Sequence, residues 1–266
     1  MSKRSDILDG TETKNLVKKY GLIYTCRGGW IDLGHLNPSN PRIEIGAENL
    51  WRQLISEGSA LTDPRCEAPK YTVVAHRVAH HFLKPEVCKT DSRYKFDDGK
   101  TGFEVRHRQD HAGYPLKPGR EGRYVVKHDL SLEQKKQVAL AIFMEVSLRF
   151  ESFQKLLSPV TDSGYSQEDL VSNLIGFYIG IGEIEKLAAL RLCHPTSDKT
   201  AYKVWDSEGA VGKNKNSEWQ PKHARATERV DTTQCRDECA LVNKQFPAEF
   251  TTIKPAPKGV WFRELP

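Results

Sequence analysis

The fold is decided by the stretch from Ser131 to Pro159, which reads SLEQKKQVALAIFMEVSLRFESFQKLLSP. Its apolar residues recur every three or four positions, which is the spacing of one face of a helix. Ser131 and Gln134 have the spacing of a capping box at a helix start, and Ser158-Pro159 ends the pattern. The stretch therefore predicts one long helix with a broad apolar face. That face comprises Val138, Ile142, Phe143, Val146, Phe150, Phe153 and Leu157.

The same periodicity predicts two further helices, a short one over Ala47–Glu57 and a long one from Ser166 to about Leu192. Between them, Lys89–Lys127 is rich in glycine and charge and poor in apolar residues. We expect this segment to be an irregular excursion with one β-hairpin, in which Phe103–Arg106 pairs with Tyr124–Lys127.

These elements predict a mainly α fold with a single helical-core domain. A chain of 266 residues is long enough for one large domain. We expect a polar N-terminal arm over 1–20, a helical core over 21–192 that contains the irregular excursion 89–127, and a C-terminal segment over 193–266 that wraps the same domain. A short helix is expected within this last segment, over Thr232–Phe246.

The charge balance argues against a nucleic-acid partner. Lys and Arg number 40 against 35 Asp and Glu, and the two signs are mixed along the chain. The densest basic stretch, Lys213–Arg229, also carries two glutamates and is interpreted as a solvated loop. No stretch approaches the roughly 18 apolar residues that a membrane span needs. The N-terminal residues show no apolar region typical of a signal peptide.

Six cysteines permit three disulfides, but an even number is weak evidence for them. Cys66 and Cys88 bracket a segment that a bridge would close in an oxidising compartment. The spacing of Cys235 and Cys239 is wider than that of a C-x-x-C redox motif. The sequence leaves free thiols and bridges both open. The full set is Cys26, Cys66, Cys88, Cys193, Cys235 and Cys239.

The first polar signature is GGWIDLGHL, Gly28–Leu36. Asp32 and His35 are three residues apart and would face the same way on a helix. A carboxylate can then orient an imidazole and raise its basicity. A satisfied structural pair is an equally good interpretation.

The second signature is GYSQEDLVSNLIG, Gly164–Gly176. Ser166 has the spacing of an N-cap with Asp169 three residues later. A stripe formed by Asp169, Asn173, Gly176 and Gly180 indicates close packing of another segment, or a floor beneath a bulky group. The acids also suit the positive end of a helix dipole, which is the structural alternative.

The remaining ionisable residues give weaker signals. Glu145 precedes Arg149 by four residues, as in a surface ion pair. Glu151 lies at the edge of the apolar face and is either exposed or part of a site. His76/His80 and His107/His111 have the i, i+4 spacing of metal ligands, but no third ligand accompanies them, so metal binding is not favoured. No Walker or dinucleotide motif is present, and the cofactor is left unknown.

Together, GLIYTCRGGWIDLGHL and GYSQEDLVSNLIG resemble a bacterial family of unknown function whose members often read GGFIDLGH and SFSPEDLYSN. Many of its members are described as lipoproteins. The resemblance implies a shared site, in which Glu151 matches the acid of a Trp-His-Glu element. Phe150 stands where that element has His, and Asn37 where the family has Arg. IDLGHLNP is also similar to the Asp-Arg-Gly-His motif of ββα-metal nucleases, which would make His35 a general base.

The favoured hypothesis is a hydrolase of the bacterial cell envelope, directed at peptidoglycan, or an exported antibacterial effector. The resemblance favours the periplasm or secretion by a non-classical route over the cytoplasm. The expected partners are an envelope polymer or small substrate and an immunity or delivery protein. The alternatives are a non-enzymatic binding module with a buried polar network and a metal-dependent nuclease. The predicted catalytic residues are Asp32, His35, Glu151, Glu168 and Asp169, and the predicted substrate-binding residues are Trp30, Ser166, Ser172 and Asn173.

Overall fold

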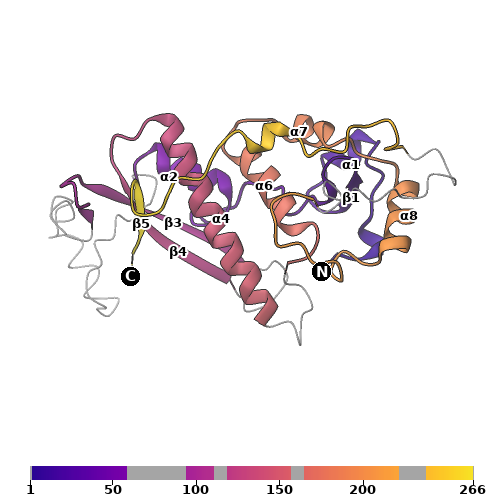
Figure 1. Ribbon diagram of the computed structural model, residues 1–266, viewed down its shortest axis with the longest axis horizontal. Helices are drawn as coiled ribbons and strands as arrows, with labels where there is room; N and C mark the ends of the chain where they lie inside the picture. The colour runs from indigo at the N-terminus through magenta and orange to yellow at the C-terminus, as the bar shows by residue number, and fades with distance from the viewer. Residues whose placement is uncertain (1, 59–93, 111–118, 157–164, 222–237, 266) are drawn as a thin grey trace.

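The computed structural model describes residues 2–58, 94–110, 119–156, 165–221 and 238–265 (Figure 1). The helical elements are η1 (Arg4–Asp6), α1 (Thr13–Leu16), α2 (Ala47–Ile55), α4 (Leu132–Leu156), α6 (Asp169–Gly180), α7 (Lys186–Leu192), α8 (Asp198–Glu208) and η5 (Ala248–Thr251). The strands are β1 (Leu22–Thr25), β2 (Gly29–Asp32), β3 (Gly102–Asp110), β4 (Gly119–Lys127) and β5 (Phe262–Glu264).

The prediction of a mainly α fold is wrong, because the described residues form a mixed α/β fold with two small antiparallel sheets. One sheet is the β1-β2 hairpin, and the other has the order β3-β4-β5. The first sheet was not predicted because its strands are only four residues long, which is too short to show a clear alternation of apolar and polar residues. Strand β5 was not predicted either, because it has only three residues and pairs with β4, which lies much earlier in the chain.

The predicted hairpin in the excursion is confirmed and is longer than expected. Phe103 pairs with Val126 and Arg106 with Arg123, within strands of nine residues each. The predicted central helix is also confirmed as α4. Its start carries the expected capping box, in which Gln134 N donates to Ser131 Oγ at 3.2 Å and Ser131 N donates to Gln134 Oε1 at 2.9 Å.

Helix α4 organises the main core. It packs against the β3-β4 hairpin, against α2 and against α6. Figure 1 shows it crossing the molecule beside the hairpin, with α6 between it and the β1 region. Its face from Val138 to Phe150 is buried among apolar residues of these elements. The hydrophobic effect therefore ties the β3-β4 hairpin, α2 and α6 to one helix, and β2 packs in turn against α6.

The second long helix is not continuous as predicted, since α6 ends at Gly180 and α7 begins at Lys186. Gly182 lies in the break with φ of 80°, a conformation that favours glycine and that a helix does not contain. Gly180 and Gly182 both weaken the helical state, so the chain turns here.

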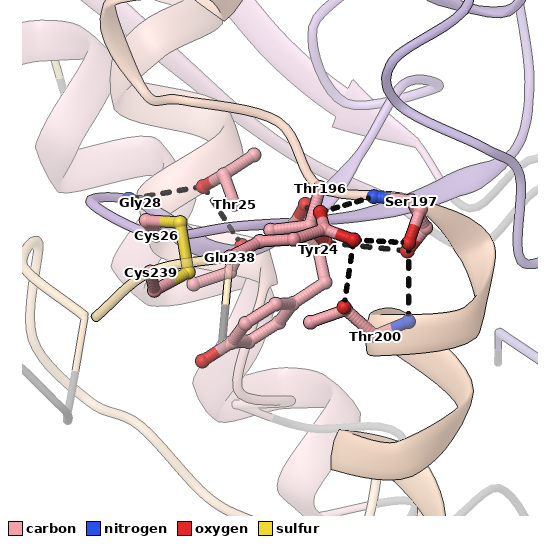
Figure 2. The surroundings of a disulfide bond; sticks show 10 residues. Tyr24, Thr25, Cys26, Gly28, Thr196, Ser197, Thr200, Glu238 and Cys239 are labelled. Carbon is pink, nitrogen blue, oxygen red and sulfur yellow. Dashed lines mark hydrogen bonds between the residues drawn. A yellow bond between two sulfur atoms is a disulfide. The ribbon is translucent and has the colours of Figure 1, made fainter. Parts of the chain in front are cut away.

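The C-terminal segment runs along the length of the molecule, from the neighbourhood of α8 to β5 (Figure 1). A disulfide between Cys26 and Cys239, with Cα atoms 5.2 Å apart, joins this segment, near the start of its described range 238–265, to the end of β1 (Figure 2). Glu238 adds a polar anchor, because its carboxylate accepts hydrogen bonds from Ser197 N and Thr200 Oγ1 at the start of α8. The disulfide and these hydrogen bonds attach this segment to β1 and to the start of α8.

Some predictions fall outside the described residues. The part of the Thr232–Phe246 helix that is described, 238–246, forms turns, which corrects that prediction there. The cysteines Cys66, Cys88 and Cys235 and the histidines His76, His80 and His111 lie in segments that are not described, as do residues 71–83 and 222–229. Within the described ranges, every helix is too short or too polar to cross a membrane.

Candidate functional site

A cleft of about 380 Å³ opens where the turn after β2 meets the first turn of α6 and strand β3. Both signatures contribute to its lining, although His35 of the first and Asn173 of the second are 138 positions apart in the chain. The predicted site residues that line it are Asp32, His35, Ser166, Glu168, Asp169 and Asn173.

The turn after β2 is built by Asp32. Its Oδ1 atom accepts a hydrogen bond from Gly34 N at 2.7 Å, and its backbone carbonyl accepts from His35 N at 3.2 Å. Asp32 N donates to Ser172 Oγ at 2.9 Å, which attaches the end of β2 to α6. Asp32 and His35 thus lie in a tight turn, whereas the sequence analysis considered a helix.

Two glycines on α6 allow the turn after β2 and the start of α2 to pack closely against this helix. A Cβ atom at Gly176 would lie 2.7 Å from the backbone oxygen of His35 and 3.1 Å from the Cα atom of Leu36. One Cβ at Gly180 would lie 2.6 Å from the Cβ atom of Ala47. The predicted stripe of small residues is therefore a close-packing surface, and it supports the turn that carries His35.

The imidazole of His35 is held from both sides by α6. Its Nδ1 atom lies 3.2 Å from Asn173 Oδ1, and its Nε2 atom lies 3.7 Å from Asp169 Oδ1. Burial opposes protonation of the ring, but the combined charges of Asp169, Asp32, Glu151 and Glu168 outweigh it and raise the pKa of His35 to about 9. The ring is therefore an imidazolium at neutral pH, able to donate from both nitrogens.

Three carboxyl groups are buried beside this ring. Glu151, Glu168 and Asp169 are 0%, 2% and 7% exposed. Burial raises the pKa of Glu168 to about 8, with a further contribution from the neighbouring charge of Asp169. Burial also raises the pKa of Glu151 and that of Asp169, and the proximity of these two carboxyl groups adds to the shift of Asp169. The cluster therefore holds part of its protons at neutral pH, and the negative charge that remains on it stabilises the protonated ring of His35.

A hydroxyl group lies between two of the acids. Ser2 Oγ is 3.3 Å from Glu168 Oε1 and 3.5 Å from Asp32 Oδ2. An oxygen atom at the position of Ser2 Oγ therefore lies within about 3.5 Å of both the Asp32 and the Glu168 carboxyl groups. A substrate hydroxyl or a water at that point would contact the same two acids.

Three of the predicted residues do not line the cleft. Trp30 is buried in a separate apolar cluster, where its ring packs edge-on against Trp205 with centroids 5.8 Å apart. Ser172 is fully buried, and its hydroxyl accepts from Asp32 N. Glu151 is fully buried behind Asp169, and its Oε2 atom accepts from Tyr165 N at 2.8 Å. Ser172 and Glu151 therefore position the site and do not reach a ligand.

Four residues of β3 line the cleft without having been predicted, and His107 and Gln109 are two of them. His107 was considered only as half of a metal pair with His111. Gln109 Nε2 donates to Asn173 Oδ1 at 3.2 Å, so it belongs to the His35 network. Their spacing of two residues in a strand, which puts both side chains on one face, was the available signal.

The described residues contain no group of three or more His, Cys, Asp or Glu side chains arranged to hold a metal ion. Comparison with protein-family models, with curated proteins and with solved structures gives no match. The geometry of the cleft is therefore the only basis for inferring its chemistry.

Proposed function

We propose that this protein is a hydrolase of the bacterial cell envelope, directed at peptidoglycan, that works by acid-base catalysis at a site formed by carboxyl groups and His35. The observation that carries the proposal is that His35, Glu168 and Asp32 face one cleft, with buried acids around an imidazolium. Titratable groups with displaced pKa values that converge in a cleft are typical of catalytic sites.

In this mechanism Glu168 is the general acid. Its pKa of about 8 keeps the carboxyl protonated at neutral pH, so it can give a proton to the oxygen or nitrogen of the leaving group. Asp32, across the Ser2 position, takes a proton from the attacking water. The bond to the leaving group breaks as the water oxygen bonds to the substrate, and solvent then returns both acids to their starting states.

His35 serves as a fixed positive charge in this mechanism. Its two nitrogens point at Asn173 and Asp169, which hold the ring at the cleft. A preorganised cation next to the reacting bond stabilises negative charge that develops in the transition state. Asn173 acts through this ring and is a positioning residue in the proposal.

The envelope as the location rests on two arguments. One is the resemblance of both signatures to a family with many lipoproteins. The other is the Cys26–Cys239 disulfide, because structural disulfides persist in oxidising compartments such as the periplasm. An exported effector with an immunity partner fits the same arguments.

The test is release of soluble fragments from purified peptidoglycan sacculi by the full chain. Glu168→Gln and His35→Gln are each expected to lower the rate at least a hundredfold, since one proton-transfer group contributes roughly 10²–10⁴ and one preorganised electrostatic group roughly 10²–10³. Two matched controls change the same residue types outside the cleft. His128→Gln removes an imidazole bound to Glu57, and Glu208→Gln removes a carboxyl whose pKa burial also raises. No release by the wild-type chain, or equal rates in all four variants, would contradict the proposal.

A non-enzymatic binding module is the competing candidate, and one observation favours it. Asp32, Glu151 and Asp169 each accept a hydrogen bond from a backbone N–H, at Gly34, Tyr165 and Ser166. Such acids could be kept because they fix the chain. Melting temperatures separate the two candidates. Loss of release with little change in melting supports catalysis, whereas a large loss of stability in Glu168→Gln without any wild-type activity supports the structural network.

A further inference from the structure

One wall of the cleft carries polar groups that the described residues leave without hydrogen-bond partners. His107, on β3, is 1% exposed, and neither of its ring nitrogens has a partner there. Its ring packs beside Phe143 with centroids 5.4 Å apart. Burial lowers the pKa of His107 to about 3, so the ring is neutral and offers one donor and one acceptor.

The side-chain amides of Gln109 and Asn173 supply two more polar atoms without partners among the described residues. Gln109 Nε2 donates to Asn173 Oδ1, and this single bond leaves Gln109 Oε1 and Asn173 Nδ2 without partners among the described residues. The first is an acceptor and the second is a donor. Asn173 is 3% exposed, so its free amide hydrogen is as buried as the His107 ring.

Leaving such groups unpaired is costly. A buried donor or acceptor without a partner costs roughly 1–3 kcal/mol, and natural proteins contain few of them. Several at one wall of one cleft are therefore best explained by a ligand that completes them. The wall is uncharged, because it consists of a neutral imidazole and two carboxamides. It suits a neutral ligand with both an acceptor and a donor.

A secondary amide has these two groups, since its carbonyl accepts and its N–H donates. The apolar side chains of Phe143 and Phe150 line the same cleft and would suit a methyl group beside that amide. Tyr20 lies at the mouth, 63% exposed, with its ring over Gly34. An exposed aromatic ring beside a polar cleft offers a flat apolar face for a sugar ring.

We infer that the wall formed by His107, Gln109 and Asn173 is a subsite for the acetamido group of an N-acetylated sugar. The inference rests on the proposed function, because it names the part of an envelope glycan that this cleft would hold. Hydrogen bonds to the acetamido group would come from Asn173 Nδ2 and His107, and Gln109 Oε1 would accept from its N–H.

The test measures binding by calorimetry to the Glu168→Gln protein, in which turnover is suppressed. The probes are tri-N-acetylchitotriose, cellotriose, which lacks the acetamido groups, and a short N-acetylated peptide. We expect the acetylated trisaccharide to bind at least tenfold more tightly than cellotriose, because each buried hydrogen bond contributes about 1 kcal/mol. Equal binding of the two trisaccharides, or a preference for the peptide, would overturn the inference.

The variant that tests the wall is His107→Phe, made in the same Glu168→Gln background. It keeps a ring beside Phe143 and removes both partnerless nitrogens, so it should melt no lower than its parent while losing most of the preference for the acetylated sugar. Ser147→Ala is the matched control. The Ser147 hydroxyl is also buried without a partner among the described residues but does not line the cleft, so its removal should leave the preference unchanged.

Two further results keep the outcomes distinct. Gln109→Met replaces His107→Phe if the latter does not fold, and it should reduce the same preference. Binding selectivity without release from sacculi by the wild-type chain would reject the hydrolase and retain the subsite. Release with equal binding of acetylated and plain trisaccharides would reject the subsite and retain the hydrolase.

Discussion

The Nδ1 atom of His35 lies 3.2 Å from Oδ1 of Asn173, although the two residues are 138 positions apart in the chain. This contact joins the two polar signatures of the sequence. The opposite nitrogen of the ring faces Asp169, one helical turn before Asn173. The ring is therefore held between two acceptors, an arrangement that suits an imidazolium and gives the site its positive charge.

The first prediction concerns the charge of His35. Asp169→Asn removes the largest favourable charge at the ring while keeping an oxygen that can accept from Ser166 N. We expect the pKa of His35 to fall from about 9, because one carboxylate no longer stabilises the imidazolium. NMR titration of the ring measures it directly.

A surface variant controls for general charge effects. Asp206→Asn also removes one negative charge, but Asp206 pairs with Arg4 at an exposed position outside the cleft. The His35 midpoint should stay at its wild-type value in this variant. An unmoved midpoint in Asp169→Asn would mean that the contact at 3.7 Å does not set the charge of the ring.

The second prediction is a loss of stability as the pH rises. Glu168 has a pKa of about 8 when folded against an ordinary value of 4.5, so the folded state binds its proton more tightly than the unfolded state. The stability from this group is complete below about pH 4.5 and is lost as the pH rises toward 8. His35 acts in the same direction between 6.5 and about 9.

Urea unfolding at pH 5, 7 and 9 measures this effect. The free energy of unfolding should fall by a few kcal/mol across the series, since each pKa unit corresponds to about 1.4 kcal/mol. Glu168→Gln should flatten the fall below pH 8, with an unchanged denaturant slope as the check that the folded state is intact. A wild-type stability that rises between pH 5 and 9 would contradict the buried, protonated acid.

Local spacing in the sequence predicted the features of the fold that depend on local structure. The capping box at Ser131 and the ion pair of Glu145 with Arg149 are both present, because each requires only one helical turn. The glycine stripe on α6 correctly indicated close approach, since a helix fixes which residues share a face. Spacing also grouped Asp32 with His35, but it suggested a helix where a turn exists.

The remaining parts depend on contacts that spacing does not encode. His107 and Gln109 reach the cleft because the β3-β4 hairpin packs on α4, and nothing near them in the sequence indicates that partner. Trp30 sits within the signature motif, yet its ring packs against Trp205 of α8 in a separate apolar cluster and does not line the cleft. A residue's presence in the GGWIDLGHL motif therefore did not predict that its side chain lines the cleft.

The third prediction compares two glycines on one helix. Gly176→Ala places a methyl group against the backbone of the His35 turn, while Gly180→Ala places the same group against Ala47 and Pro38. Each should lower the free energy of unfolding by about 1–3 kcal/mol, since neither site has room for the added atom. The gain in helix propensity offsets only part of this cost.

Activity separates the two variants. Gly176→Ala should also reduce the release of sacculus fragments by the folded protein, because it displaces the turn that carries His35. Gly180→Ala should retain most of the wild-type rate, because it displaces the start of α2 instead. Equal activity in both would show that the position of the turn does not limit the reaction.

The fourth prediction concerns the disulfide, which closes a separation of 213 residues. Replacing both Cys26 and Cys239 by serine should lower the free energy of unfolding by on the order of 2–5 kcal/mol, because the cross-link restricts the unfolded chain. The wild-type protein should show the same loss in reductant, and the double variant should show no further loss.

Cys193→Ala is the control, since Cys193 is buried, outside the bridge, and its replacement leaves the response to reductant intact. A wild-type melting temperature that reductant does not change would remove the structural argument for an oxidising compartment, and with it the strongest support for the envelope.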